Sequence, residues 1–383
     1  MMFGNISTET FLRDYWQKKP LLIRQAFPNF KSPITPDELA GLACETDTAR
    51  IVLEKGGKEP WEVRHGAFDE SEFAKLPATH WTLLVNDTDQ HLPELKAMLD
   101  PFRFIPDWRI DDLMISFAVE GGSVGAHIDA YDVFLIQAQG TRRWQISTQA
   151  VDDDNFLPDV ELRIIRDFTH EQEWVVEPGD MLYLPPNMPH YGVALDQCMT
   201  YSVGFRAPSQ ADMLENLLES VLEDPCLQQR FSDADRDTPT TNPGELTATD
   251  MDKLIDFVID ALPQDTHALQ LWLGKYLTTP KANAVLPNVP DEPMRRAELT
   301  RLINRKKTFH KALGCRLLYF VADSKTYLFI NGEMNTISSD YSNFVQYLCN
   351  SQALRYPEYH QFLVNEECIA FFQDLVSSGV FFT

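Results

Sequence analysis

The chain has 383 residues, of which 44% are hydrophobic and 11% aromatic, so it can bury a sizeable core in two or three domains and is not expected to be disordered. Its formal net charge of -24 at pH 7 argues against general nucleic-acid binding, because a phosphate backbone would be repelled; an acidic surface could attract a basic partner or simply keep the protein soluble. Six cysteines without a Cys-x-x-Cys pair, no apolar run of about 18 residues and no signal-like N-terminus predict a cytoplasmic protein without a membrane span.

Residues 1–100 are expected to form an α/β segment. The pattern predicts a helix over 8–18 and a short strand over 20–24. A second helix is predicted to begin at Thr35, which has the features of an N-cap, because a proline and two acidic residues follow it.

Between residues 114 and 206 the pattern changes to short strands. Clusters of Gly, Pro, Asp and Asn separate the apolar runs, as is typical of strands that alternate with tight turns. Many short strands of this kind favour a β-sandwich or barrel. The predicted strands cover 114–119, 132–137, 143–146, 173–176, 181–184 and 200–205.

Helical periodicity begins after Ala207-Pro208. Three short amphipathic helices are predicted over 209–223, 249–262 and 266–277, with a polar loop over 232–245. Such helices cannot bury much apolar surface alone, so they must pack on the strand domain or on a second subunit. A homodimer is the preferred expectation.

A proline-rich stretch over 279–292 is expected to be a linker. The Asn331-Gly332 pair beyond it predicts a hairpin turn. Helices plus a hairpin of this size suit a winged-helix module, and its short basic run could touch an acidic partner or be a solvated helix face. The predicted elements are helices over 295–310, 339–349 and 358–377, and strands over 316–321 and 327–330.

The candidate chemistry lies in His127-Ile128-Asp129 and in His190, which follows a Pro-Gly-Asp turn, a short apolar strand and two paired prolines. In a strand, residues i and i+2 point the same way, so His127 and Asp129 could hold one ion together. Two imidazoles and one carboxylate on one face of a metal leave the other face open, as non-haem Fe(II) oxygenases need. The seven other histidines lack such context and are interpreted as structural or solvated.

Arg142 is expected on a strand that returns after the Ala138-Gln139-Gly140 turn as the hairpin partner of 132–137. An inward guanidinium there would make a planar two-point contact with a carboxylate, which lysine cannot imitate. An exposed strand arginine is an equally good interpretation from the residues alone.

Several segments resemble the JmjC/cupin-type 2-oxoglutarate oxygenases, and within them the bacterial ribosomal oxygenases. The resemblance extends over essentially the whole chain and is specific in the strand-rich part. The segments that carry it are residues 111–116, 127–134, 142–144, 178–190 and 201–208, together with the early 16–21 run.

This resemblance implies an α+β protein in three parts. Residues 1–207 would form a double-stranded β-helix (jelly-roll) catalytic domain, 208–280 a helical dimerisation region and 290–383 a winged-helix-like C-terminal domain. Fe(II) would be bound by His127, Asp129 and His190, with O2 as the oxidant.

The resemblance also implies roles for the neighbouring side chains. Arg142 would pair with the far carboxylate of 2-oxoglutarate, and Ser116 would help to hold it. Members of the family hydroxylate a ribosomal protein, and the bacterial branch acts on the β-carbon of an arginine in the sixteenth protein of the large subunit. The implied clamp for that arginine consists of Asp112, Met114, Tyr131 and Ser202.

Three alternatives stay open. The same enzyme class could act on histidine or methyl-lysine; Asp112 favours a cationic side chain but does not separate arginine from methyl-lysine. A non-catalytic metal-binding cupin in ribosome assembly would have no need of Arg142. DNA binding through the winged helix is disfavoured by the net acidity.

Overall fold

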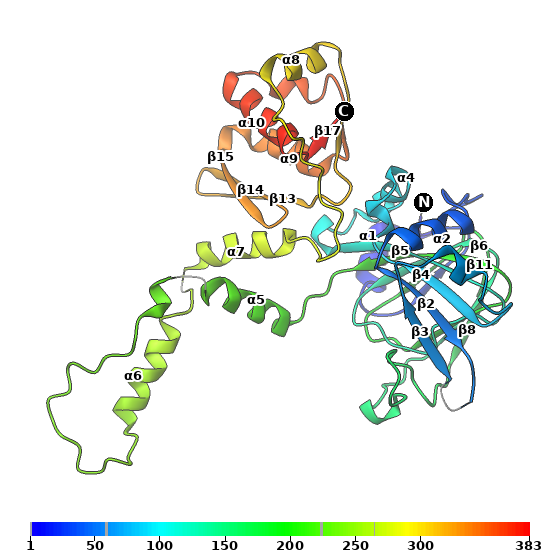
Figure 1. Cartoon of the computed structure of the whole chain (residues 1–383), viewed down its shortest axis with the longest axis horizontal. Coiled ribbons are helices and arrows are strands. Elements are labelled where there is room, and N and C mark those ends of the chain that lie inside the picture. Colours follow the sequence, from blue (N-terminus) through cyan, green and yellow to red (C-terminus); the bar gives the residue numbers. More distant parts are fainter. Residues whose placement is uncertain (1, 58–59, 223–224, 264) are drawn as a thin grey trace. The chain divides into compact units, whose positions relative to one another are not determined.

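The computed structural model describes residues 2–57, 60–222, 225–263 and 265–383 (Figure 1). The chain divides into two compact units. The first contains residues 1–207, 281–288 and 312–314, and the second contains 208–280, 289–311 and 315–383.

Within the described residues, the first unit has two antiparallel sheets. Eight strands are ordered β1-β9-β6-β11-β5-β4-β2-β3 and three are ordered β10-β7-β8. Neighbouring strands such as β2, β3 and β4 can be followed in Figure 1. The strands are β1 (Leu21–Ile23), β2 (Ala49–Glu54), β3 (Trp61–His65), β4 (Trp81–Val85), β5 (Ile110–Ala118), β6 (Val133–Gln139), β7 (Arg142–Ile146), β8 (Gln172–Val176), β9 (Met181–Leu184), β10 (His190–Ala194) and β11 (Cys198–Phe205).

The two sheets face each other across a shared apolar cluster. Its buried members come from β6 and β9 of the large sheet and from β7 and β8 of the small one: Val133, Leu135, Trp144, Ile146, Val176, Leu182 and Leu184. This packing of two sheets is the jelly-roll arrangement that the sequence predicted.

Side chains along the central strands β5 and β11 alternate between the two faces of the sheet. One face lies against the main core, and the other faces the interior of the barrel. Leu113 and Ile115 on β5, and Tyr201 and Val203 on β11, are fully buried in the main apolar core. The residues between them point to the opposite face of the sheet. Because the register fixes this alternation, one strand pair supplies both the core and a row of polar side chains.

Short helices precede and interrupt the strands: α1 (Thr8–Asp14), α2 (Pro36–Glu45), α3 (Glu70–Phe73) and α4 (Pro93–Ala97). The predicted start of α2 is confirmed, because the Thr35 hydroxyl accepts from the Glu38 N–H while the Glu38 carboxylate accepts from the Thr35 N–H. The predicted first helix is shorter than expected. The strands β2, β3 and β4 were missing from the prediction.

The predicted hairpin between the 132–137 strand and the Arg142 strand is wrong. β6 pairs with β9 and β11, whereas β7 pairs with β8 and β10. The chain crosses from one sheet to the other at Gly140, which has φ +63°, and where a Cβ would lie 2.2 Å from the Gln197 carbonyl oxygen. Only glycine fits this crossing.

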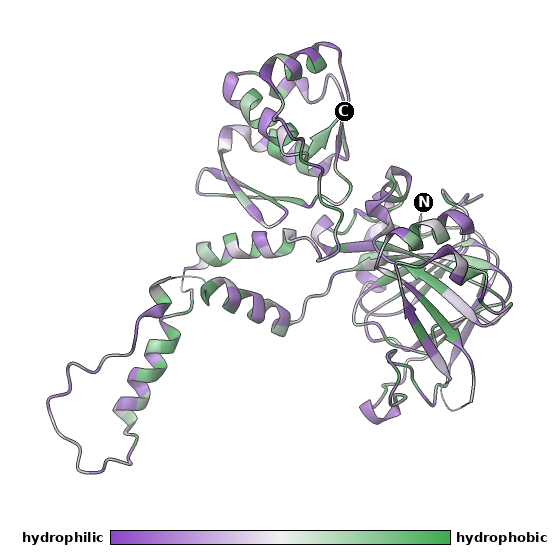
Figure 2. Cartoon of the chain, in the orientation of Figure 1, coloured by the Kyte–Doolittle hydropathy of each residue, from purple (hydrophilic) through white to green (hydrophobic). Residues whose placement is uncertain are grey.

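The second unit begins with three helices, α5 (Gln210–Leu222), α6 (Ala248–Ile259) and α7 (Thr266–Thr278). The three helices predicted here are confirmed, except that residue 223 of the first lies outside the described residues. Figure 2 shows hydrophobic residues recurring along α5 and α6. Many of these side chains are exposed: Leu214, Leu218, Leu222, Met251, Leu254, Ile255, Phe257, Val258 and Ile259.

The rest of the second unit combines helices with two small sheets. The predicted Asn331-Gly332 turn is confirmed: both residues have positive φ and join β14 to β15. The predicted helix over 295–310 ends early, because its last part forms the strand β12. The elements are α8 (Arg296–Asn304), β12 (Phe309–Lys311), β13 (Leu317–Ala322), β14 (Lys325–Ile330), β15 (Glu333–Ser338), α9 (Ser342–Asn350), β16 (Ala353–Leu354), α10 (Glu366–Ser377) and β17 (Phe381–Phe382).

Candidate metal centre and the cavity around it

The backbone brings His127 and His190 together. His127 lies in the loop before β6 and forms an isolated antiparallel bridge with His190, the first residue of β10. Each residue donates its N–H to the carbonyl of the other, at 3.0 Å in both directions. Asp129 is held in the same loop by the Asn187 N–H, which donates to its carbonyl at 2.7 Å. The predicted strand through His127 and Asp129 is therefore wrong, but the predicted meeting of three side chains is found.

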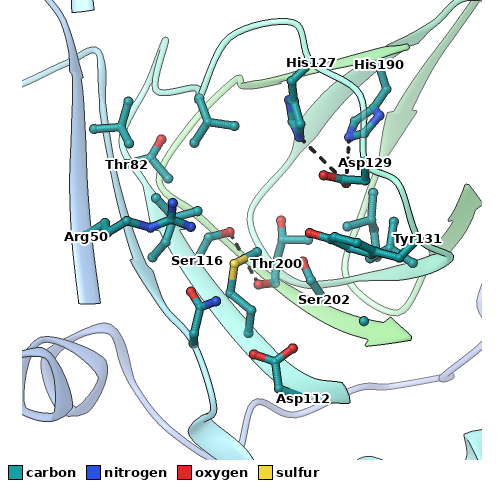
Figure 3. Close-up of a pocket in the computed structure, with 18 of the residues that line it drawn as sticks. Arg50, Thr82, Asp112, Ser116, His127, Asp129, Tyr131, His190, Thr200 and Ser202 are labelled. Carbon is teal, nitrogen blue, oxygen red and sulfur yellow. Dashed lines mark hydrogen bonds and ion pairs between the residues drawn. The ribbon is translucent and has the colours of Figure 1, made fainter. Parts of the chain in front are cut away.

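The three side chains converge on one point (Figure 3). The Asp129 Oδ2 lies 3.9 Å from the His127 Nε2 and 3.6 Å from the His190 Nε2. One potential ligand atom of each lies within 4.8 Å of the others. In the described part of the chain this is the one such group of three His, Cys, Asp or Glu side chains. These separations suit ligands arranged around a single ion.

Each imidazole is oriented by its second nitrogen. The Nδ1 of His127 lies 3.0 Å from the Gly125 carbonyl oxygen, and the Nδ1 of His190 lies 2.9 Å from the Met188 carbonyl oxygen. A carbonyl can only accept, so each Nδ1 carries the proton and each Nε2 presents its lone pair. Burial, helped by His127, lowers the pKa of His190, so this ring is neutral at pH 7 and ready to ligate.

A cavity of about 350 Å³ opens beside these three residues. All nine site residues predicted from the sequence line it. They are His127, Asp129, His190, Arg142, Ser116, Asp112, Met114, Tyr131 and Ser202.

Arg142 is buried in the wall of this cavity, with 5% of its surface exposed. Its guanidinium carbon lies 5.6 Å from the centre of the Trp144 ring, and its Nε and Nη2 atoms have no hydrogen-bond partner among the described residues. A buried and unpaired charge costs several kcal/mol, so this site is suited to an anion that enters the cavity. The interpretation of Arg142 as an exposed strand residue is excluded.

The β5–β11 register places the remaining polar side chains in rows. Ser116 lies opposite Thr200, and Met114 lies opposite Ser202. The Ser116 hydroxyl contacts the Thr200 carbonyl at 3.5 Å, a long and weak hydrogen bond that leaves this hydroxyl available to a ligand. In Figure 3 the side chains of Ser116, Thr200 and Ser202 lie between the candidate ligand group and Asp112.

Asp112 is a buried carboxylate at the far end of this row from Ser116. Its Oδ2 accepts from the Asp87 N–H at 3.0 Å and lies 4.0 Å from the Lys281 Nζ. Burial raises the pKa of Asp112 to about 7, with Asp87 and Asp111 adding to the rise and Lys281 opposing it. A buried carboxylate in this state is well suited to receive a cationic guest.

Several cavity residues were missed by sequence reasoning. Arg50 on β2, Thr82 on β4 and Asn86 just after β4 line the same cavity, and so do Leu162 and Arg163. The first three could not be found because their strands were not predicted. For the two residues on and after β4, the short apolar run Leu83-Leu84-Val85 is the one signal that could have indicated a strand.

Comparison with known proteins agrees with this geometry. Residues 97–213 match the JmjC domain family, and residues 261–382 match the ROXA-like winged helix family. The chain is 35% identical to the ribosomal protein uL16 3-hydroxylase of Escherichia coli, over 97% of this chain and 96% of that protein. The chain belongs to the JmjC ribosomal oxygenase family. A second relative, a probable ribosomal oxygenase of Haemophilus influenzae, is 32% identical over 88% of this chain and 85% of its own length.

Solved structures of this ribosomal oxygenase family show the same fold. The X-ray structure of E. coli YcfD matches with a TM-score of 0.86 at 34% identity, covering 99% of this chain and 98% of that chain. A YcfD complex with cobalt and 2-oxoglutarate matches with a TM-score of 0.83 over the same shares of the two chains. The predicted fold, a mixed helix and sheet protein with a JmjC/cupin barrel and a C-terminal winged helix, is confirmed. No described helix has the length and apolarity to cross a membrane.

Proposed function

We propose that this ribosomal oxygenase is an Fe(II)- and 2-oxoglutarate-dependent enzyme that hydroxylates the β-carbon of an arginine in ribosomal protein uL16. The observation that carries the proposal is that one cavity contains two features. The first is the group of three potential metal ligands, which faces the cavity, and the second is the Arg142 guanidinium, whose Nε and Nη2 atoms have no partner among the described residues. The relation to a uL16 3-hydroxylase supports the choice of substrate.

The residues present fit a ferrous ion. His127, Asp129 and His190 would hold it through two imidazole nitrogens and one carboxylate, and the remaining positions would face the cavity. When bound, Fe(II) with 2-oxoglutarate and O2 supplies the oxidising power to insert one oxygen atom into a C–H bond, with release of succinate and carbon dioxide. The cobalt and 2-oxoglutarate complex of YcfD supports this cofactor set.

The cosubstrate would be anchored at the end that does not react. The Arg142 Nε and Nη2 atoms can donate two parallel hydrogen bonds to a carboxylate, and the Ser116 hydroxyl can donate a third. Neutralising the buried Arg142 makes cosubstrate binding favourable. It also fixes which end of the molecule points toward the ligand group.

The substrate arginine would enter between four side chains of distinct chemistry. The carboxylate of Asp112 would neutralise the guanidinium, and Met114 and Tyr131 would pack on its stem and plane. The Ser202 hydroxyl, opposite Met114 in the register, would accept one remaining N–H. With the guanidinium fixed at Asp112, a carbon nearer the peptide backbone is left closer to the ligand group.

Two other functions are less well supported. Histidine as a substrate would place a largely neutral imidazole beside the buried Asp112, which gains more from a permanent cation. A non-catalytic cupin would keep Arg142 buried and unpaired for no benefit, at a cost of several kcal/mol. Methyl-lysine is separated from arginine only by experiment.

We further propose a three-part organisation: a catalytic domain over 1–207, a dimerisation region over 208–280 and a winged-helix-like domain over 290–383. The exposed apolar side chains of α5 and α6 support a homodimer, since exposed patches of this kind mark interaction surfaces. Ribosomal protein as a substrate supports a cytoplasmic location. The formal charge of -24 supports a function without direct nucleic-acid binding.

The test is mass spectrometry of a synthetic uL16 peptide incubated with the protein, Fe(II), 2-oxoglutarate and O2. The expected product is heavier by one oxygen atom, located on the β-carbon of a single arginine, with one succinate formed for each hydroxylation. A peptide in which lysine replaces that arginine serves as the matched control. Oxygen on the lysine peptide, or none on the arginine peptide, would contradict the proposed substrate.

A further inference from the structure

One lysine, Lys281, lies close to three carboxylates at the edge of the cavity. The Nζ of Lys281 lies 2.9 Å from the Asp87 Oδ1, 3.0 Å from the Asp111 Oδ2 and 4.0 Å from the Asp112 Oδ2. Asp111 and Asp112 line the cavity, whereas Lys281 is not among the described residues that do so. The lysine therefore reaches the cluster without occupying the space of a guest.

Lys281 is held in this position by the short segment 281–288, which belongs to the catalytic unit. The Val285 N–H donates to the Gln90 Oε1 at 2.8 Å, and the Gln90 Nε2 donates to the Asp87 Oδ1 at 3.2 Å. Gly314 packs against this segment, since a Cβ on it would lie 2.0 Å from the Val285 carbonyl oxygen. Such anchoring reduces the entropy that a free lysine would lose in ordering its side chain.

The charges of this cluster are nearly balanced. Asp87, Asp111 and Asp112 contribute three negative charges when ionised, and Lys281 contributes one positive charge. Arg206 contributes a second, because its Nε lies 3.1 Å from the Asp111 Oδ1. The cluster is thus one positive charge short of neutrality, which is the charge that one arginine side chain would add.

The two oxygens of Asp112 have different surroundings. Oδ2 receives the Asp87 N–H and faces Lys281. Oδ1 lies on the side of Gly204 on β11, where a Cβ would approach it to 3.3 Å. Gly204 itself lines the cavity, so the small residue leaves Oδ1 open toward a guest.

We infer that Lys281 is a positioning residue for the substrate: it is a built-in cation that keeps the clamp carboxylate of Asp112 ionised and leaves the cluster matched to one incoming positive charge. This role rests on the proposed function, since it assumes that Asp112 receives the target arginine. Lys281 would act through Asp112 and need not touch the substrate.

The other groups around Asp112 make this cation necessary. Asp87 approaches from the turn after β4, Asp111 adjoins it on β5, and Tyr131 faces it from the loop before β6. Burial, Asp87 and Asp111 favour the protonated form of Asp112, whose pKa is about 7 even with Lys281 present. The other cation of the cluster, Arg206, is paired with Asp111. Burial opposes the charge of Lys281, yet Asp112, Asp111 and Asp87 together raise its pKa, so the lysine stays protonated at neutral pH.

Removal of Lys281 has effects of opposite sign at low and high pH. Below neutrality, Asp112 would be protonated in the variant and would bind arginine weakly. At alkaline pH, Asp112 ionises in both proteins, and the variant cluster then has one more uncompensated negative charge, so it binds arginine at least as tightly as the wild type. A purely structural role for Lys281 would weaken binding at every pH.

The test measures binding of a synthetic uL16 peptide to the iron-free protein by calorimetry from pH 6 to pH 9. Two peptides are compared, one with the target arginine and one with neutral citrulline in its place. The variants are K281M, K281Q and the charge-preserving K281R. K281Q retains a hydrogen-bond donor, so the test does not depend on the folding of K281M alone. The matched control is K96M, because the Lys96–Asp89 pair at 2.9 Å is a neighbouring and similarly shielded ion pair outside the cavity lining.

As the pH is lowered, the affinity for the arginine peptide should begin to fall about one pH unit higher in K281M and K281Q than in the wild type. At pH 6 this difference is a loss of affinity of about tenfold. The difference should vanish or reverse by pH 9, K281R and K96M should resemble the wild type, and citrulline binding should not respond to the substitutions. A uniform loss at all pH values, or no change, would overturn the role of Lys281 while leaving the proposed function standing. A wild-type protein that binds both peptides equally would instead contradict the proposed function.

Discussion

His127 and His190 each donate a backbone hydrogen bond to the other, at 3.0 Å in both directions, although they lie far apart in the sequence. This bridge joins the loop before β6 to the start of β10 and fixes the distance between the two imidazoles through the main chain. The carbonyls that accept from the two Nδ1 atoms then fix the ring orientations. The proposed ligand pair is therefore preorganised by backbone contacts.

Asp129→Ala is expected to remove metal binding while the fold is retained. The bridge between the two histidines does not involve the Asp129 side chain, so the loop should keep its course. Loss of one of three ligands should lower the affinity for Co(II), measured by calorimetry, by at least about 100-fold, because loss of an outer partner alone costs about 10- to 100-fold. Asp154→Ala, at an exposed position, is the matched control. Unchanged Co(II) affinity in Asp129→Ala would remove the ligand assignment.

Arg142 substitutions should separate stability from cosubstrate binding. Arg142→Met removes a buried charge that has two unpartnered nitrogen atoms, so the protein without cosubstrate is expected to melt at a higher temperature. The same variant should lose the stabilisation that added 2-oxoglutarate gives the wild type, and Arg142→Lys should bind 2-oxoglutarate about 10- to 100-fold more weakly. Thermal melting with and without 2-oxoglutarate checks both effects. Equal stabilisation of wild type and Arg142→Met would show that another residue anchors the cosubstrate.

The pH dependence of peptide hydroxylation should follow Asp112. Its pKa is raised to about 7 by burial, so the carboxylate is present above pH 7 and is lost as the pH falls below it. kcat/KM for the uL16 peptide should therefore decrease about tenfold for each pH unit below 7, whereas turnover of 2-oxoglutarate without peptide should decrease much less.

Asp112→Asn tests this assignment directly. The amide preserves the shape but cannot neutralise a guanidinium, so peptide hydroxylation should fall by about 10- to 100-fold and lose its acid limb. An acid limb that persists in Asp112→Asn would assign the titration to another group.

The sequence predicted which side chains meet at the candidate metal centre better than it predicted the scaffold that holds them. The His-x-Asp pair and the distant His190 could be proposed as ligands because few residue types bind iron, and the nine predicted residues all line one cavity. The pairing of the strands was not predictable in the same way. Arg142 was placed in a hairpin with β6, yet its strand belongs to the other sheet, because the choice between sheets is decided by packing across the barrel and not by local pattern.

Lys281 shows a second limit of sequence reasoning. It lies in the proline-rich stretch that was predicted to be a linker, and the residues next to it in the sequence do not indicate a contact with Asp87 or Asp111. That contact arises only because segment 281–288 packs on the catalytic unit. Arg50 was missed for a related reason: β2 is buried on both faces, with only small changes in exposure along it, so it lacks the alternation that marks a half-buried strand.

The exposed apolar stripe of α5 and α6 predicts that the protein is a dimer in solution. Leu218 is 45% exposed and Ile255 is 50% exposed, and each is one of several apolar side chains on its helix that the described structure leaves uncovered. Burying a Leu or Ile side chain contributes about 1.5–3 kcal/mol, so an interface that covers several of them is stable. A charge at its centre would oppose association strongly.

Leu218→Glu and Ile255→Glu should therefore convert a dimer, with twice the 43.9 kDa mass of the chain, into a monomer in light scattering coupled to size-exclusion chromatography. Glu219→Gln on α5 changes charge beside the stripe without adding a carboxylate to it, and should remain dimeric. If the catalytic unit folds independently of this interface, the monomers should still bind Co(II) with wild-type affinity, because the three proposed ligands all come from residues 127–190 of that unit. A wild-type chain that elutes as a monomer at micromolar concentration would show that the stripe does not serve self-association.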